Sequence, residues 1–207
     1  MKLTAAPPTS FKTDPDKHFR THDDALWRVY YRASAHPAAW NKLREFGPVE
    51  DMRFDPHPLP KGVHPGIGVT YAASSSQTAL AEAFQERLID RRDMHPAIAG
   101  WVPTRPLTLL DLTSRWPVLN KGAAAIMMGD KEYTQAWARA IEYQLRDEID
   151  GLYYLSSVDS QPCMALFTRT QRVNAWPARP DFAVALSDPA LKPIMADMVE
   201  EYDYKVI

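Results

Sequence analysis

The segment Gly68-Val-Thr-Tyr-Ala-Ala-Ser-Ser-Ser-Gln-Thr-Ala-Leu-Ala-Glu82 carries the clearest structural pattern in the chain. Its first part belongs to a strand predicted at residues 67–72, because β-branched and aromatic residues favour strands. A serine-rich turn follows, and from about residue 75 to 92 apolar residues recur at the spacing of an amphipathic helix. Sites for small molecules often form where a strand end meets a helix start. We therefore expect the phenol of Tyr71 and the carboxylate of Glu82 to lie in one cleft.

The rest of the chain changes irregularly between short strands and short helices. Strands are predicted at residues 25–31, 107–112, 151–155, 164–167 and 173–176, and helices at 38–46, 131–148 and 188–200. The 18 prolines outnumber the 8 glycines, which indicates stiff connections between short elements. Because no regular strand–helix–strand repeat is present, we predict an α+β fold with a mixed sheet and flanking helices.

The composition indicates a globular protein and excludes several classes of function. A chain of 207 residues with 45% hydrophobic and 24% charged residues suits one domain with extensions. The net charge of −2 does not provide the basic surface that nucleic-acid binding requires. No apolar run has the length of a signal peptide or a membrane span, so we expect a cytoplasmic protein without membrane contact. Cys163 is the only cysteine, which excludes an intramolecular disulfide.

Each candidate residue also has an ordinary structural interpretation. Glu82 would suit the solvent-facing side of its helix, and Tyr71 would suit a core position in its strand. Arg28 and Arg53 could each form a surface ion pair, the most frequent role of a lone arginine. Ser156 and its neighbour Ser157 stand at a strand end, where serines commonly cap backbone groups.

Several common active-site patterns are absent from the sequence. No Gly-x-Ser-x-Gly motif surrounds a serine, so a hydrolase nucleophile elbow is unsupported. The histidines are scattered without His-Glu-x-x-His spacing, and we predict no metal site. Gly66-Ile-Gly68 lacks the third glycine of a dinucleotide-binding loop and precedes a strand instead of a helix.

The order of several short motifs resembles the RES domain, a family named for its arginine, glutamate and serine. The motifs are Leu26-Trp-Arg-Val-Tyr30, Arg53-Phe54, Val69-Thr-Tyr71, Ala79-Leu-Ala-Glu82, Leu109-Leu-Asp-Leu112, Asp150-Gly-Leu-Tyr-Tyr-Leu-Ser-Ser157 and Ala165-Leu-Phe167. The resemblance covers roughly residues 25–170. Residues 1–24 would then form an N-terminal arm, and residues 171–207 a C-terminal extension of a strand and a helix packed on the domain.

The resemblance implies a fold similar to ADP-ribosyltransferases and a toxin that consumes NAD by cleaving its nicotinamide–ribose bond. An Xre-like antitoxin protein would neutralise it, NAD would be its substrate with no further cofactor, and a homodimer is an additional option. Two alternatives stay open. The first is a protein ADP-ribosyltransferase that modifies a specific host protein, and the second is a non-catalytic binding module.

The family's site residues correspond to Tyr71, Glu82 and Ser156, with Ser157 as the alternative serine and either Arg53 or Arg28 as the arginine. A carboxylate stabilises the positive charge that develops on the ribose, the role expected of Glu82. A guanidinium grips pyrophosphate in a bidentate manner. The Tyr71 ring would pack against nicotinamide and orient its carboxamide. The serine would hydrogen-bond the ribose or steady the arginine.

Overall fold

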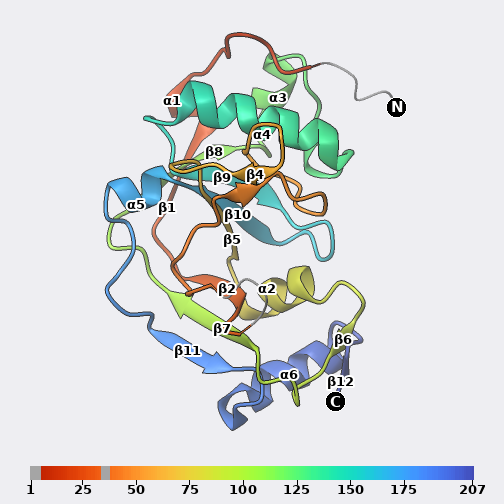
Figure 1. Cartoon of the computed structure of the whole chain (residues 1–207). Helices are drawn as coiled ribbons and strands as arrows, with labels where there is room; N and C mark the ends of the chain where they lie inside the picture. The colour runs from red at the N-terminus through yellow and green to blue at the C-terminus, as the bar shows by residue number, and fades with distance from the viewer. Residues whose placement is uncertain (1–5, 34–37) are drawn as a thin grey trace.

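The computed structural model describes residues 6–33 and 38–207, and Figure 1 shows the whole chain. Its main sheet contains β1 (Phe19–His22), β2 (Leu26–Tyr31), β5 (Val69–Ala73), β7 (Pro96–Trp101), β8 (Leu107–Asp111), β9 (Gly151–Leu155), β10 (Pro162–Phe167) and β11 (Phe182–Ala185). These eight strands lie in the order β1-β8-β9-β10-β5-β2-β7-β11. The pair β8–β9 is parallel and the other pairs are antiparallel. The sheet is therefore mixed, as predicted.

Two small two-stranded sheets and several helices complete the fold. The small sheets pair β3 (Phe46–Gly47) with β4 (Gly62–Val63), and β6 (Leu88–Ile89) with β12 (Lys205–Val206). The helices are α1 (Pro15–His18), α2 (Ser76–Ala83), α3 (Trp116–Leu119), α4 (Lys131–Leu145), α5 (Arg169–Arg172) and α6 (Lys192–Glu200), with 3-10 turns η1 (Ala124–Met127) and η2 (Pro189–Leu191). Helices flank a mixed sheet without regular alternation, which confirms the predicted α+β class. None of the described helices is long and apolar enough to cross a membrane.

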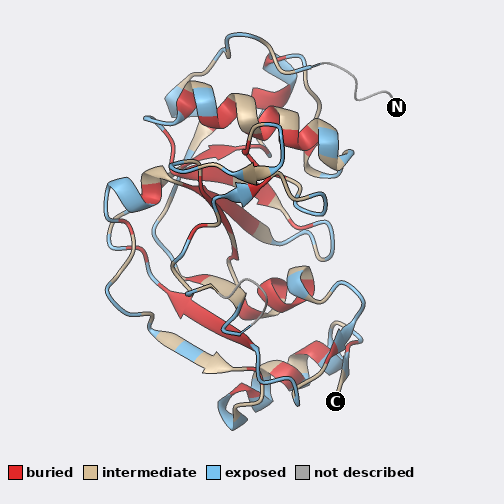
Figure 2. Ribbon diagram, in the orientation of Figure 1, coloured by how far each residue is buried: buried red, intermediate tan, exposed pale blue. Residues whose placement is uncertain are grey.

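The helices cover two ends of the sheet. In Figure 1, α3 and α4 lie over β8, β9 and β10, whereas α2 and α6 lie near β2, β7 and β11. One hydrophobic core, which includes residues of α3 and α4, contains Trp116 and Trp137. Another, which includes residues of α2 and α6, contains Leu80, Ile98 and Met198. Figure 2 shows that buried residues concentrate in the central strands and on the inner sides of α4 and α2. Hydrophobic burial on both sides of the sheet is the main force that holds these layers together.

Part of the expected N-terminal arm is integral to the sheet. Residues Phe19–His22 form β1, the edge strand that pairs with β8. The ring of Phe11 packs 4.7 Å from that of Trp116, measured between ring centroids. The backbone of Lys12 exchanges two hydrogen bonds with the side chain of Asn120. The first five residues of the arm lie outside the described part of the chain.

Three predicted elements differ from the structure. The helix expected at 75–92 ends at Ala83, because residues 88–89 pair as β6 with β12 instead of continuing the helix. Residues 38–46 do not form a helix, since the side chain of Arg28 takes two of the carbonyl groups in this segment and Arg44 bridges to Val69. Residues 173–176 do not form a strand and follow α5 as a turn.

Candidate active site

The side chains of Glu82 and Ser156 meet although 74 residues separate them in sequence. Glu82 occupies the last turn of α2, and Ser156 follows the end of β9 directly. The hydroxyl of Ser156 donates to Oε1 of Glu82 at 2.6 Å. The hydroxyl oxygen of Ser156 accepts hydrogen bonds from the backbone amides of Val158 at 3.0 Å and Asp159 at 3.3 Å. The turn after β9 thus holds the serine, and the serine holds the carboxylate.

The geometry distinguishes between the two candidate serines. Ser156 is completely buried, whereas Ser157 is exposed in the turn. The contacts account for this difference, because the Ser156 hydroxyl is enclosed by Glu82 and by two backbone amides of the turn. Of the two, only Ser156 is hydrogen-bonded to Glu82.

Two tyrosines lie on the sheet face beside this pair. Tyr71 of β5 is opposite Ala165 of β10, and Tyr154 of β9 is opposite Cys163 of β10. Residues directly opposite each other share a face, and so do residues two positions apart in one strand. Tyr71 and Tyr154 therefore project to the same face, and only the small side chains of Ala165 and Cys163 separate them on β10.

Electrostatic effects connect these tyrosines with the acid and an arginine. Burial raises the pKa of Tyr154 well above its ordinary value, and electrostatic interactions with Cys163, Glu82 and Tyr71 raise it further, whereas the interaction with Arg53 lowers it. Charges act on one another more strongly in a low-dielectric interior than in water. Tyr154 therefore lies within electrostatic range of Glu82, Tyr71 and Arg53.

Tyr71 presents an unusual hydroxyl. The ring is half-buried, but the hydroxyl oxygen is buried and forms no well-aligned hydrogen bond with any described residue, although the backbone of Phe54 lies near enough to act on it. Burial raises the pKa of Tyr71, and the charge of Asp55 acts in the same direction. The phenol is therefore protonated at neutral pH and keeps a donor and an acceptor for another molecule.

Arg53 is held in place by the region around the start of α4. Its guanidinium donates to the carbonyl oxygen of Gly129, and its own carbonyl accepts from the hydroxyl of Thr134 at 2.7 Å. The neighbouring Phe54 is fully buried, and its ring centroid lies 4.7 Å from that of Tyr154. These contacts bring residues 53–54 to the sheet face that carries Tyr154.

Arg28, the alternative arginine, lies elsewhere. Trp27 packs in the same core as the tyrosines, so the next side chain of β2 points to the opposite face of the sheet. Arg28 donates to the carbonyl oxygens of Trp40 at 2.8 Å and Lys42 at 3.0 Å. Burial lowers the pKa of Arg28 to about 10. The structure places Arg53 within electrostatic range of Tyr154, and it places Arg28 on the opposite face of the sheet.

Comparisons with known proteins show the family of the chain. A family model for the RES domain matches residues 25–187, most of the chain. The chain belongs to the RES domain family. Among solved structures, the crystal structure of the M. tuberculosis MbcT–MbcA toxin–antitoxin complex contains a chain of similar fold, with a TM-score of 0.55 and 17% sequence identity over 85% of this chain and 90% of that one. A search of curated proteins finds no match.

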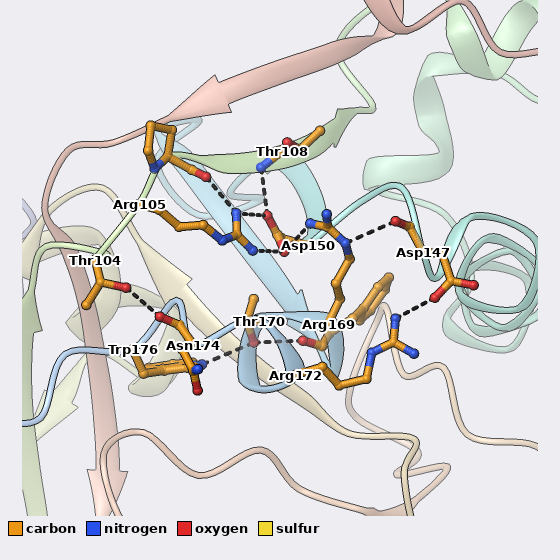
Figure 3. Close-up of polar contacts among 12 residues, drawn as sticks. Thr104, Arg105, Thr108, Asp147, Asp150, Arg169, Thr170, Arg172, Asn174 and Trp176 are labelled. Atoms are coloured by element: carbon orange, nitrogen blue, oxygen red, sulfur yellow. Dashed lines mark hydrogen bonds and ion pairs between the residues drawn. The ribbon is translucent and has the colours of Figure 1, made fainter.

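A buried charge network anchors the strand that carries Tyr154 in this RES domain. Asp150, immediately before β9, is fully buried, and Figure 3 shows two arginines converging on it. Arg105 donates to both carboxylate oxygens at 2.7 and 2.8 Å, and Arg169 donates to one of them at 2.8 Å. The backbone amide of Thr108 adds a fourth hydrogen bond at 2.9 Å. The start of β9 is therefore tied to β8 and α5, which fixes the position of the site residues further along the strand.

A second buried ion pair stabilises the loop behind Tyr71. Asp55 and His57 are fully buried and bonded to each other, and Arg44 donates to the same carboxylate at 2.9 Å. Burial alone would raise the pKa of Asp55, but the hydrogen bond from His57 and the other donors hold it below its ordinary value. Sequence reasoning did not identify this pair or Tyr154. A Tyr-Tyr dipeptide places one ring on each face of a strand, and the sequence alone does not say which face carries the site.

The two hollows described in this RES domain lie away from the group around Glu82. The larger, of about 510 Å³, is lined by residues including Arg20, Tyr153 and Met164. The side chains of Tyr153 and Met164 point to the face opposite Tyr154, because strand residues alternate. The smaller, of about 290 Å³, is lined by Asn41, Gln171, Asn174 and Trp176. Neither hollow is lined by Glu82, Tyr71 or Tyr154. The candidate site therefore rests on the chemistry and contacts of its side chains.

Proposed function

We propose that this protein is a toxin that consumes NAD by cleaving the bond between nicotinamide and ribose, and that an Xre-like antitoxin protein neutralises it. The observation that carries the proposal is the hydrogen bond from Ser156 to Glu82 beside two tyrosines and Arg53. Membership of the RES domain family and the likeness to a chain from a toxin–antitoxin complex support it.

In the proposed reaction, the C–N glycosidic bond breaks and its electron pair leaves with nicotinamide, which becomes neutral. Positive charge develops on the ribose, and the carboxylate of Glu82 stabilises it. The Ser156 hydrogen bond to one carboxylate oxygen fixes the direction of the group and leaves the other oxygen for the sugar. Water then bonds to the ribose carbon and releases a proton, which yields ADP-ribose.

The other residues would bind and orient the dinucleotide. The Arg53 side chain has five N–H donors, of which the Gly129 carbonyl takes only part, so others can bind pyrophosphate. The Tyr71 hydroxyl, buried and without a well-aligned partner among the described residues, can donate to the nicotinamide carboxamide. Because burial raises the pKa of both phenols, Tyr71 and Tyr154 remain neutral donors at neutral pH.

The direct test is turnover of NAD by the purified protein. NAD labelled in its adenylate part is incubated with the wild type and with Glu82→Gln, which removes the charge but keeps the shape, and the products are separated by chromatography. We expect nicotinamide and ADP-ribose from the wild type, and turnover lower by about 10²–10³-fold in the variant. Glu86→Gln, an exposed glutamate four residues further on, is the matched control and should match the wild type. Full activity in folded Glu82→Gln protein would reject the catalytic assignment.

The same assay separates hydrolysis from its alternatives. Label retained on a protein acceptor, with little free ADP-ribose, would indicate ADP-ribosyl transfer. Growth arrest that persists unchanged on expression of folded Glu82→Gln protein would favour a binding module. Relief of growth arrest by co-expression of an Xre-like protein that co-purifies with this chain would support the proposed antitoxin.

A further inference from the structure

The helix that carries Glu82 is too short to hold its own position. Helix α2 contains only 8 residues, and isolated helices of this length are unstable in water. Its N-terminus is capped, because the Ser75 side chain accepts from the backbone amide of Thr78. At the other end, the carbonyl of Leu80 accepts from the amide of the cap residue Phe84, and the carbonyl groups of residues 81–83 need partners from elsewhere. The position of Glu82 therefore depends on contacts made by other parts of the chain.

The C-terminal residues supply many of these contacts. The hydroxyl of Tyr204 donates to the carbonyl oxygen of Ala81 at 3.2 Å in a buried setting, which satisfies one of the terminal carbonyls. The side chain of Gln77 donates to Asp197 at 2.8 Å. Leu80 and Ala81 share a buried apolar core with Met195, Met198 and Tyr204. In Figure 1, α6 and β12 lie near α2 and β6.

The same C-terminal residues also reach the turn that holds Ser156. The carboxylate of Asp159 accepts from the hydroxyl of Tyr202 at 3.1 Å and from the hydroxyl of Thr78 in α2 at 2.8 Å. The backbone amide of Asp159 in turn donates to Ser156. A continuous series of hydrogen bonds thus runs from Tyr202 through Asp159 and Ser156 to Glu82.

The chain immediately after α2 is held by the same region. Strand β6 pairs in parallel with β12, so that Leu88 lies opposite Lys205 and Ile89 opposite Val206. The C-terminal residues therefore contact α2, the strand that follows it and the turn after β9. These are the elements that carry and adjoin the two partners of the Glu82–Ser156 hydrogen bond.

We propose that residues 188–207, which lie beyond the RES match at 25–187, form a clamp that sets the catalytic position of Glu82. In this clamp Tyr204 positions the end of α2, and Tyr202 positions the Ser156 turn through Asp159. Neither tyrosine needs to touch the substrate. This inference rests on the proposed function, because it assigns the clamp to the same site.

The test removes single hydroxyl groups and leaves the aromatic rings in place. Tyr202→Phe and Tyr204→Phe are compared with Tyr143→Phe, a control whose ring is 76% exposed on α4. We expect kcat for NAD cleavage to fall by about tenfold in each clamp variant, since small displacements of catalytic groups cost this much or more. The KM for NAD should stay within about twofold, because the binding groups are not altered. The control variant should keep both constants.

A double-mutant comparison identifies the route of the effect. In a Glu82→Gln background, Tyr204→Phe should cause no further loss of residual activity, because the residue that it positions is already disabled. Wild-type turnover that depends on Glu82 but is unchanged in both clamp variants would overturn the clamp and leave the proposed function intact.

Hydrogen exchange provides a readout that does not depend on activity. If the clamp holds α2, the amides of residues 79–83 should exchange about tenfold faster in Tyr204→Phe than in Tyr143→Phe. Failure of the wild type to cleave NAD would reject the proposed function, and the exchange result would still decide whether the C-terminal residues hold this helix. Unchanged exchange of these amides in Tyr204→Phe would overturn the clamp.

Discussion

The replacement Ser156→Ala tests the contact on which the proposed site depends. The hydroxyl is buried and takes part in three hydrogen bonds, one donated to the carboxylate of Glu82 and two accepted from the amides of Val158 and Asp159. Alanine removes all three with almost no change in volume. The expected effects therefore come from hydrogen bonding and not from a cavity.

The size of the effect follows from the kinds of bond that are lost. A hydrogen bond to a charged group contributes about 1.5–3 kcal/mol, and a neutral one contributes about 0.5–1.5 kcal/mol. Water can replace the serine at the amide of Val158, because that residue is exposed in the turn. We expect Ser156→Ala to lower the free energy of unfolding by about 2–4 kcal/mol in total. Turnover should fall by about 10–100-fold, which corresponds to about 1.4–2.8 kcal/mol in the barrier, because Glu82 is free to rotate.

Urea unfolding followed by tryptophan fluorescence measures the free energy of unfolding. The NAD assay measures turnover without urea, under conditions where the variant is folded. Ser157→Ala is the matched control, since it makes the same chemical change one residue further along at an exposed position. It should alter stability by less than about 0.5 kcal/mol and leave turnover unchanged. Equal losses in the two variants, or wild-type behaviour of Ser156→Ala, would refute the assignment of Ser156 to the site.

Three further predictions test other parts of the structure. Asp150→Asn should lower the free energy of unfolding by about 3–5 kcal/mol in urea titrations, because it leaves two partly buried arginines without their carboxylate. Asp147→Asn, at a side chain that is 77% exposed, should change it little. Burial alone would raise the pKa of Asp150, but its arginine partners hold that pKa below the ordinary 3.8. The contribution of Asp150 to the free energy of unfolding is therefore complete above pH 3.8 and should be lost as the pH falls through the folded-state pKa. Unfolding curves of the wild type and Asp150→Asn at decreasing pH would reveal this loss. Tyr71→Phe should leave stability within about 1 kcal/mol, since the hydroxyl makes no well-aligned bond among the described residues, but should reduce NAD turnover; unchanged turnover would remove the hydroxyl from the site. Burial raises the pKa of the Cys163 thiol, so iodoacetamide at pH 8 should modify it only in unfolded protein, and rapid labelling of the native protein detected by mass spectrometry would contradict its burial.

Local patterns predicted the elements on which the site stands. The strand at Tyr71, the helix start near Ser75, the helix from residue 131 and the strand before Ser156 all appear in the structure, because turn chemistry and periodicity act over a few residues. The resemblance of several short motifs to the RES domain, stated from the sequence, is confirmed by the family match over residues 25–187. The α+β class followed from the same elements and from the absence of regular alternation.

Elements that depend on distant partners were not predictable. Strand β7 is buried on both faces and reads as a short apolar run, and the edge strand β1 carries exposed polar residues, so neither shows a clear two-residue period. The helix at α2 ends early because residues from the far C-terminus pair with the chain that follows it. Tertiary hydrogen bonds outweighed the local preference for a longer helix.

The sequence by itself determined which residue types are present, their order and the short elements that carry them, because these depend on neighbouring residues. Only the tertiary structure decided that Arg53 and not Arg28 acts on Tyr154, and that Ser156 and not Ser157 bonds to Glu82. It also decided that Tyr154 and not Tyr153 shares the sheet face of Tyr71. Those choices depend on strand register and on which face of the sheet each side chain occupies. A shift of one residue exchanges the two faces of a strand, and contacts between segments far apart in the chain set the register.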